Sequence, residues 1–149
     1  TDIPAVRTKL ANMYPVGNTN IPLGVEFGYN LLDPAQPYTQ GNPYSDKQTQ
    51  KYLIILTDSI QTSKQSGSDG TRSVENGNKN LVELCKKAKH SDIEVFAIAY
   101  DVTDPAITNL LRDCAKDNYF EPDGYGSEIN SVFAQIADKI KNRMVHISR

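Results

Sequence analysis

The sequence predicts an α/β protein in a single domain spanning residues 1–149, with a mostly parallel sheet flanked by helices on both faces. Three observations predict this fold. Apolar runs at 52–57 and 93–100 have the composition of strands buried on both faces. Segments with apolar residues at helical spacing separate and flank these runs, so helix and strand alternate along the chain. The chain of 149 residues is also the length of one ordinary domain.

The first half of the chain predicts two helices and one strand. A helix is expected at 3–13, with Asp2 as its cap and Pro4 in its first turn. A second helix is expected to begin at Ile21 or Pro22, and an irregular loop at 33–50 precedes the strand at 52–57. The residues expected on the apolar faces of the two helices are Val6, Leu10 and Met13, then Leu23, Phe27, Leu31 and Leu32.

The second half continues the alternation after a polar loop at 59–77. The expected elements are a helix at 78–89, a strand at 93–100, a helix opened by Asp104-Pro105, a strand at 118–120 and a helix at 127–145. The residues expected to face the core in these helices are Leu81, Leu84, Cys85, Ala88, Ile107, Leu110, Leu111, Cys114, Ile129, Val132, Phe133, Ile136, Ala137 and Ile140.

Charge and hydropathy exclude some partners. The formal net charge is −2, with acidic and basic residues interspersed. This balance argues against nucleic acid or an anionic membrane surface as the main partner, because either needs a basic patch. No apolar run approaches the roughly 18 residues of a membrane span. Two cysteines, Cys85 and Cys114, are compatible with one disulfide or with two free thiols.

The strand at 52–57 ends abruptly on Thr57, Asp58 and Ser59, and Asp101 follows the strand at 93–100. Ligands of open parallel sheets bind beyond the carboxyl ends of the strands, where these acids are expected. The alternative is that the two acids cap the next helix or solvate a loop. Periodicity does not choose between these interpretations.

Several motifs follow one another along the chain. The pattern begins with Gly17-Asn-Thr-Asn-Ile-Pro-Leu-Gly24, a Pro-rich loop and Leu53-Ile-Ile-Leu-Thr-Asp58. It continues through Leu84-Cys85-Lys-Lys-Ala-Lys, Ile93-Glu-Val-Phe-Ala-Ile-Ala99, Leu110-Leu-Arg-Asp-Cys-Ala115, Tyr119-Phe120, Phe133-Ala-Gln-Ile-Ala137 and Arg143. The ordered set covers nearly the whole chain. It resembles the von Willebrand factor type A (vWA) domain, and most closely the C-terminal part of the TadG-like proteins of Tad (tight adherence) pilus assembly.

The resemblance implies a metal-ion-dependent adhesion site at the strand ends. Thr19 matches the second-loop ligand of the family and Asp58 the third-loop acid, with Mg²⁺ (or Mn²⁺ or Ca²⁺) as the cation. The rim around them would comprise Asn18, Asn20, Ser59 and Asp101. Two departures make the site incomplete: Ser59 stands where the family has Gly, and no Asp-x-Ser-x-Ser motif occurs in the 149 residues.

The resemblance also implies a function and an address. The chain is expected to be a non-enzymatic interaction or adhesion domain that binds a protein partner. Pilus or cell-envelope components are the partners that the resemblance implies. The expected location is the periplasm or the cell surface, with anchoring to the membrane through sequence outside this chain. TadG-like proteins often carry cysteines at the places of Cys85 and Cys114, which lie on the inner stripes of consecutive helices. A disulfide between them is therefore expected, with an oxidising compartment.

The strand at 52–57 is expected to have an unsatisfied edge. In the vWA topology it lies between the strand at 94–100 and the strand that carries Asp-x-Ser-x-Ser, which is missing here. Unpaired amides along an apolar strand are costly and adhesive. Three arrangements would relieve this: an early segment of the chain covers the edge, upstream sequence completes the sheet, or two chains pair as a homodimer.

The alternative function is an α/β hydrolase or nucleotide-binding enzyme that uses Asp58 and Asp101. Together with Ser59 and His90, these acids supply the residue types of a hydrolytic triad. However, Ser59 lacks the Gly-x-Ser-x-Gly elbow, and no Gly-x-Gly-x-x-Gly or Walker pattern follows a strand. A third interpretation is a structural remnant without a working site. The loop residues Tyr38, Tyr44 and Tyr125 are either anchors for a protein partner or packed locally.

Overall fold

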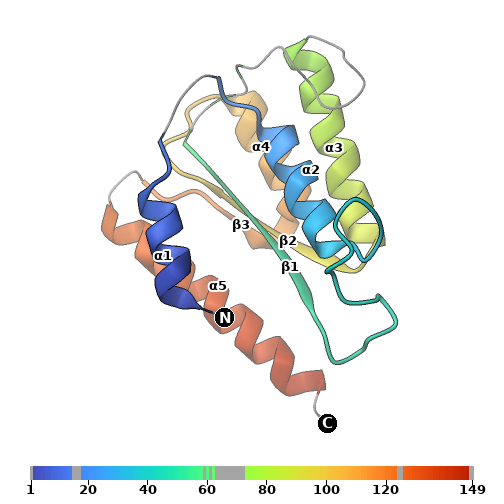
Figure 1. Cartoon of the computed structure of the whole chain (residues 1–149). Coiled ribbons are helices and arrows are strands. Elements are labelled where there is room, and N and C mark those ends of the chain that lie inside the picture. Colours follow the sequence, from blue (N-terminus) through green and yellow to red (C-terminus); the bar gives the residue numbers. More distant parts are fainter. Residues whose placement is uncertain are drawn as a thin grey trace.

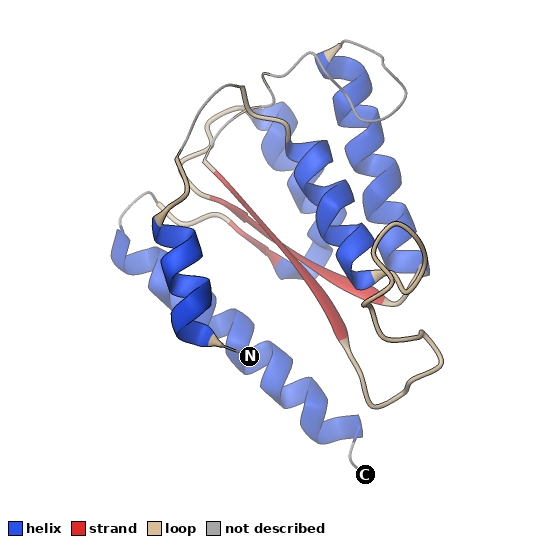
Figure 2. Ribbon diagram, in the orientation of Figure 1, coloured by secondary structure: helices blue, strands red, loops and turns tan. Residues whose placement is uncertain are grey.

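The chain was analysed as a computed structural model, which describes residues 2–14, 18–58, 60, 62, 73–123 and 126–147, with side chains up to residue 143. Figures 1 and 2 show the arrangement of its elements. In chain order they are α1 (Ile3–Ala11), α2 (Ile21–Leu32), β1 (Lys51–Thr57), α3 (Val74–His90), β2 (Ile93–Ala99), α4 (Pro105–Ala115), a 3₁₀ turn (Lys116–Asn118), β3 (Tyr119–Phe120) and α5 (Gly126–Ile147).

The three strands of the described residues form one parallel sheet in the order β1-β2-β3. β1 and β2 pair along their whole length, from Lys51 opposite Ile93 to Thr57 opposite Ala99. β2 is the central strand and is buried at every position except Glu94, which is half-buried. The prediction of a parallel α/β sheet is confirmed, and so is the pairing of the first strand with the second.

Helices cover both faces of the sheet, as predicted. α2, α3 and α4 lie on one face, and α5 lies on the other (Figure 2). The side chains of Leu53, Ile55 and Val95 point into the larger core beneath α2, α3 and α4. Those of Phe96 and Ile98 point to the opposite face and pack with α5. This alternation is the period of two that a strand imposes on its side chains.

Polar residues fix the starts of four helices. At α1 the Asp2 side chain accepts a hydrogen bond from the amide of Ala5 at 3.0 Å, as predicted. The Asn20 side chain accepts a hydrogen bond from the amide of Leu23 at 3.1 Å, at the start of α2. Ser73 and Asp104 cap α3 and α4 in the same way. The predicted loop at 59–77 is therefore too long, because α3 already begins at Val74 and buries Gly77. The remainder of that predicted loop, apart from residues 60 and 62, lies outside the described residues.

The predicted buried stripe of α2 is wrong. Leu23 and Phe27 are each 52% exposed and Leu31 is 42% exposed, while Leu32 packs at the margin of the core. The residues that face the core instead are Ile21, Pro22, Val25 and Tyr29. Two further helices also differ from prediction. Val6, Leu10 and Met13 around α1 are exposed, and α5 buries Val132 and Ile136 but exposes Phe133 and Ala137.

A disulfide joins α3 to α4. The Cα atoms of Cys85 and Cys114 lie 5.3 Å apart, and the predicted bond between them is present. Cys85 is buried in the larger core, and Cys114 packs against its margin. The bond therefore joins two of the helices that cover β2.

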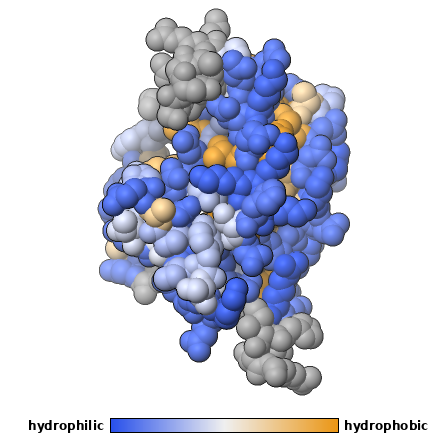
Figure 3. All heavy atoms as spheres, turned by 90° about the vertical axis from the view of Figure 1, so that its right-hand side faces the viewer, coloured by the Kyte–Doolittle hydropathy of each residue, from blue (hydrophilic) through white to orange (hydrophobic). Residues whose placement is uncertain are grey.

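The outer surface of the helical layer is largely polar. Figure 3 shows the side of the molecule that lies at the right in Figure 1, where α3 and the loop at 33–50 are found. Hydrophilic residues dominate this face, and hydrophobic residues gather in a limited area. The sheet edge formed by β1 lies on a different side of the molecule (Figure 1).

Candidate functional site

The carboxyl ends of β1 and β2 form the rim on which the predicted site residues lie. Asp58 directly follows β1, and Asp101 follows Tyr100 beyond the end of β2. The amide of Tyr100 donates a hydrogen bond to the carbonyl of Thr57 at 2.9 Å, which continues the ladder between the two strands. Both carboxylates are exposed. Because the strands are parallel and in register, the two acids leave the sheet at the same edge.

The loop before α2 reaches the same edge. The amide of Thr19 donates to the hydroxyl of Thr62 at 2.9 Å, and the amide of Thr62 donates to the carbonyl of Thr19 at 3.1 Å. Thr19 and Thr57 line one groove, so Thr19 lies at the end of β1 that carries Asp58. Asn18 is exposed on this loop.

Two rim residues have local structural roles or special backbone geometry. The side chain of Asn20 caps α2, so its carbonyl oxygen is already engaged. Asp101 has a φ of 54°, in the left-handed region that Asp and Asn tolerate better than most residues. Ser59, the remaining predicted rim residue, lies outside the described residues.

The described side chains do not fit a resident metal centre. Thr19 and Asp58 offer a hydroxyl and a carboxylate, whereas Mg²⁺ demands near-octahedral coordination by oxygen. Within the described part of the chain, no three His, Cys, Asp or Glu side chains come together closely enough to hold an ion. A hydrated cation would have to obtain most of its ligands from water or from another molecule.

His90 lies away from the two acids with which it would form a hydrolytic triad. His90 is the last residue of α3, and its Nδ1 lies 2.7 Å from the carbonyl oxygen of Lys86 in the same helix. It therefore lies near the amino end of β2, whereas Asp58 and Asp101 lie at the carboxyl ends. A strand of seven residues separates these ends by about 20 Å. His90 therefore does not form a dyad with either acid.

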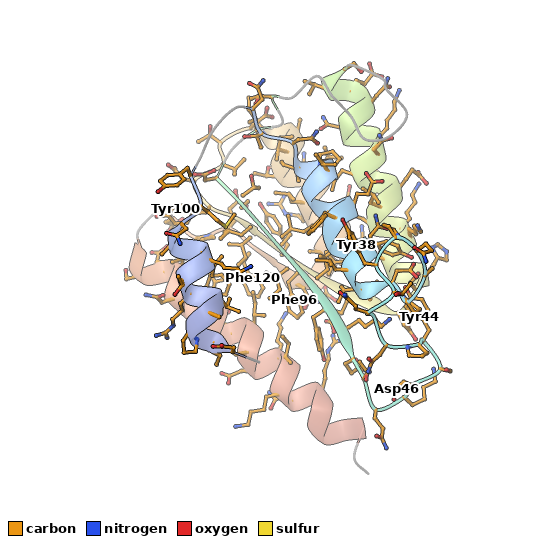
Figure 4. The ribbon with its side chains drawn as sticks, in the orientation of Figure 1. Tyr38, Tyr44, Asp46, Phe96, Tyr100 and Phe120 are labelled. Atoms are coloured by element: carbon orange, nitrogen blue, oxygen red, sulfur yellow. A yellow bond between two sulfur atoms is a disulfide. The ribbon has the colours of Figure 1, made fainter. Side chains whose placement is uncertain are left out.

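A polar pocket lies at the amino ends of β1 and β2, and the sequence did not predict it. It has a volume of about 300 Å³ and lies among the loop at 42–50, the end of α3 and Arg143 of α5. Figure 4 shows Tyr44 and Asp46 at this end and Tyr100 at the other. Arg143 pairs with Glu94 at 2.5 Å, which in turn accepts a hydrogen bond from Asn118 at 2.6 Å.

Two charged residues of this pocket, Lys51 and Asp46, hold the loop at 33–50 in place. The Nζ of Lys51 is 2.6 Å from the carbonyls of Leu32 and Asn42, and it lies 3.9 Å above the ring of Tyr44. Burial lowers the pKa of Lys51, an effect that the nearby Asp33 opposes. Asp46 accepts hydrogen bonds from Thr49 and from the amide of Gln48, and these lower the pKa of its carboxyl. A lysine directly before an apolar strand was the available sequence signal, since a buried ammonium needs acceptors.

The loop tyrosines that the structure describes are packed locally. The ring of Tyr38 meets that of Phe27 edge to face at 5.4 Å, and the ring of Tyr44 lies under Lys51. Tyr125 lies outside the described residues. Of the two interpretations of Tyr38 and Tyr44, these contacts favour local packing over a role as anchors for a partner.

Comparisons with known proteins identify no relative. No family model, no curated protein and no solved structure matches the chain. Among the described residues, no helix is both long enough and apolar enough to cross a membrane.

Proposed function

We propose that the chain is a non-enzymatic, vWA-like interaction domain that binds a protein partner at the rim of Thr19, Asp58 and Asp101. The observation that carries the proposal is the convergence of three segments, distant in sequence, at the carboxyl edge of a parallel sheet. Ligands of open parallel sheets occupy this position. His90 lies near the amino end of β2, away from Asp58 and Asp101, and this position favours binding over hydrolysis.

The chemistry of the rim favours polar recognition. The exposed carboxylates of Asp58 and Asp101 follow β1 and β2, and the loop with Asn18 and Thr19 reaches the end of β1. A partner surface with cationic or amide groups would complement these side chains. If a Mg²⁺ or Mn²⁺ ion takes part, the partner or sequence outside the chain supplies the missing ligands. The proposal does not depend on the ion.

A cell-envelope role accompanies this proposal. The bond between Cys85 and Cys114 suits an oxidising compartment such as the periplasm or the cell surface. The ordered resemblance to TadG-like proteins supports a place in Tad-type pilus assembly or envelope adhesion. Attachment to a membrane would then come from sequence outside this chain.

The test is a peptide selection with matched variants. A random peptide library displayed on phage is selected on the immobilised chain, and the enriched peptides are titrated against the unmodified chain and two variants. We expect Asp58→Asn/Asp101→Asn to weaken binding by roughly tenfold or more, because charge-assisted hydrogen bonds are lost. Asp92→Asn is the control, since Asp92 is an exposed aspartate with a φ of 57° at the other end of β2.

The outcomes are distinct. Peptides that bind the Asp58→Asn/Asp101→Asn chain as tightly as the unmodified chain would place binding elsewhere and refute the rim. Repeating the titrations with Mg²⁺, with Mn²⁺ and with a chelator then shows whether a cation contributes. Affinity that rises with the ion and falls with the chelator would indicate a metal-dependent site.

A further inference from the structure

β1 has one edge that no strand of the described residues covers. β1 is the outermost strand of the sheet, and the carbonyl of Thr57 receives its bond from β2. In a parallel ladder, the backbone groups of alternate residues point to the same side. The amides and carbonyls of residues 53, 55 and 57 therefore face β2, and those of Tyr52, Ile54 and Leu56 face outward. These residues form an open row of donors and acceptors.

Apolar side chains border this open edge on both faces of the sheet. On the α5 face, Ile54 is 42% exposed and Leu56 is 50% exposed, because α5 covers β2 and β3 but not this part of β1. On the other face, a groove of about 330 Å³ runs between α2 and β1, from Thr19 and Gly24 to Thr57.

The flank of α2 beside this groove is apolar as well. Gly24 lines the groove, and a Cβ built at this position would meet no atom within 4 Å. Phe27 and Leu31 lie one and two turns further along the same side of the helix and are exposed. A strand that pairs with β1 would therefore meet apolar side chains on both faces of the sheet and along the exposed flank of α2.

The open row of β1 is complementary to itself. When two copies of β1 run antiparallel with Ile54 opposite Ile54, Tyr52 of each copy lies opposite Leu56 of the other. The three outward amides of each copy then meet the three outward carbonyls of the other, giving six hydrogen bonds in all. The cross-strand pairs are Ile with Ile and Tyr with Leu, which stabilise sheets. No like charges oppose each other, since Lys51 lies opposite Thr57.

We propose that two copies of this chain pair through β1 in this antiparallel register and form a continuous sheet of six strands. The second copy covers Ile54 and Leu56 laterally and brings its own α2 against Gly24 and Phe27. Strand spacing of about 4.8 Å and helix spacing of 8–10 Å are compatible with both contacts. This interface borders the rim proposed to bind a partner, because Thr19 and Thr57 line the groove beside β1.

The first experiment compares two lysine substitutions by sedimentation velocity from micromolar to millimolar concentration. We expect the unmodified chain to dimerise with increasing concentration. Ile54→Lys places two ammonium groups opposite each other at the centre of the interface and should weaken the dimer by roughly tenfold or more. Phe133→Lys is the matched control, because Phe133 is 41% exposed on α5 and lies outside the interface. Circular dichroism and thermal unfolding verify that both variants fold.

The second experiment tests the register with opposite charges. Ile54→Lys and Ile54→Glu chains should each be monomeric at concentrations where the unmodified chain is dimeric. Their equimolar mixture should recover the dimer, because the two-fold register sets the lysine of one chain against the glutamate of the other. A structural defect at residue 54 would not be rescued by mixing.

Hydrogen exchange provides an independent readout of the same interface. In dilute solution the amides of Tyr52, Ile54 and Leu56 should exchange much faster than those of residues 53, 55 and 57. At high concentration this alternation should disappear. A chain that stays monomeric at millimolar concentration, a dimer insensitive to Ile54→Lys, or variants that fail to recover the dimer on mixing would each overturn the proposal.

Discussion

The two edges of the sheet differ in how they are protected. β1 presents seven residues, with neutral side chains from Tyr52 to Thr57, and no bulge or proline interrupts it. β3 has only two residues, Tyr119 and Phe120. A short edge offers few backbone groups to another strand, whereas a long apolar edge is a template for pairing.

Charged side chains also surround β3. The Nζ of Lys139 lies 5.4 Å from the ring centroid of Phe120 and donates to Asn118, and Arg112 lies 4.7 Å from that of Tyr119. Arg112 also pairs with Glu121 at 2.9 Å. These charges discourage edge-to-edge contact at β3. The comparison teaches that, among the described residues, the β3 edge is short and surrounded by charges, whereas the β1 edge is long and apolar.

The largest expected effect comes from breaking the disulfide between α3 and α4, two of the helices that cover β2. Replacing both cysteines (Cys85→Ala/Cys114→Ala) should lower the free energy of unfolding by roughly 3–4 kcal/mol, because the bond closes a loop with a sequence separation of 29. Urea unfolding of the oxidised chain and of the variant measures the difference. A reductant should destabilise the former and leave the latter unchanged; an unchanged oxidised chain would contradict the prediction.

A smaller loss is expected from the network under β3. Asn118 is buried and bridges Glu94 and Lys139, and Asn118→Ala should cost about 2 kcal/mol by removing hydrogen bonds to two charged groups. Asn109→Ala is the control, since Asn109 is exposed and bonds only to Arg112 in the described structure. Denaturant midpoints that fall equally for both variants would show that the network adds nothing.

Two tyrosines on opposite faces of the sheet should respond oppositely to loss of the hydroxyl group. Among the described residues, the buried Tyr52 hydroxyl finds no hydrogen-bond partner, so Tyr52→Phe should be neutral or stabilise the chain by about 1 kcal/mol. The Tyr29 hydroxyl lies 3.1 Å from that of Ser91, so Tyr29→Phe should destabilise by about 1 kcal/mol. Thermal unfolding at neutral pH compares them, and equal shifts in Tm would refute the distinction.

A pH dependence of stability is also expected in the alkaline range. Burial raises the pKa of Tyr29, of Tyr52 and, to about 12, of Tyr119. An unfolded chain loses these protons near pH 10, so the stabilising contribution is complete below pH 10 and is lost as pH rises towards 12. Lys51 acts in the opposite sense, because its lowered pKa favours the folded chain as pH rises.

Stability should therefore fall between pH values of about 10 and 12, since three tyrosines outweigh one lysine. Urea unfolding at several pH values measures the slope, and Tyr119→Phe should reduce it. A slope that this substitution leaves unchanged would show that Tyr119 in β3 does not contribute.

The alternation of elements was predictable because each has a strong local signal. The expected caps Asp2 and Asp104 and the apolar strands gave most boundaries within a few residues. The buried face of α2 was not predictable from its period. Ile21, Val25 and Tyr29 have the same spacing as Leu23, Phe27 and Leu31, and both sets are apolar.

Tertiary contacts chose between these two faces. The ring of Tyr29 stacks under Lys87, its hydroxyl meets Ser91, and a Cβ at Gly28 would lie 2.7 Å from Leu53. Only the Tyr29 face of α2 can therefore lie this close to β1. The polar pocket around Lys51 was missed for a related reason. Its acceptors are carbonyls of Leu32 and Asn42, whose positions no side-chain pattern encodes.

The sequence by itself determined the fold class, the order of helices and strands, and which acids follow which strands, because these depend on composition and spacing within short segments. The resemblance already indicated an unsatisfied edge on the first strand and a place for Thr19 at the end of that strand. The tertiary structure added the strand order, which leaves this edge uncovered by any strand of the described residues. It also decided that His90 lies far from Asp58. These features depend on the order and direction of strands, which long-range packing selects.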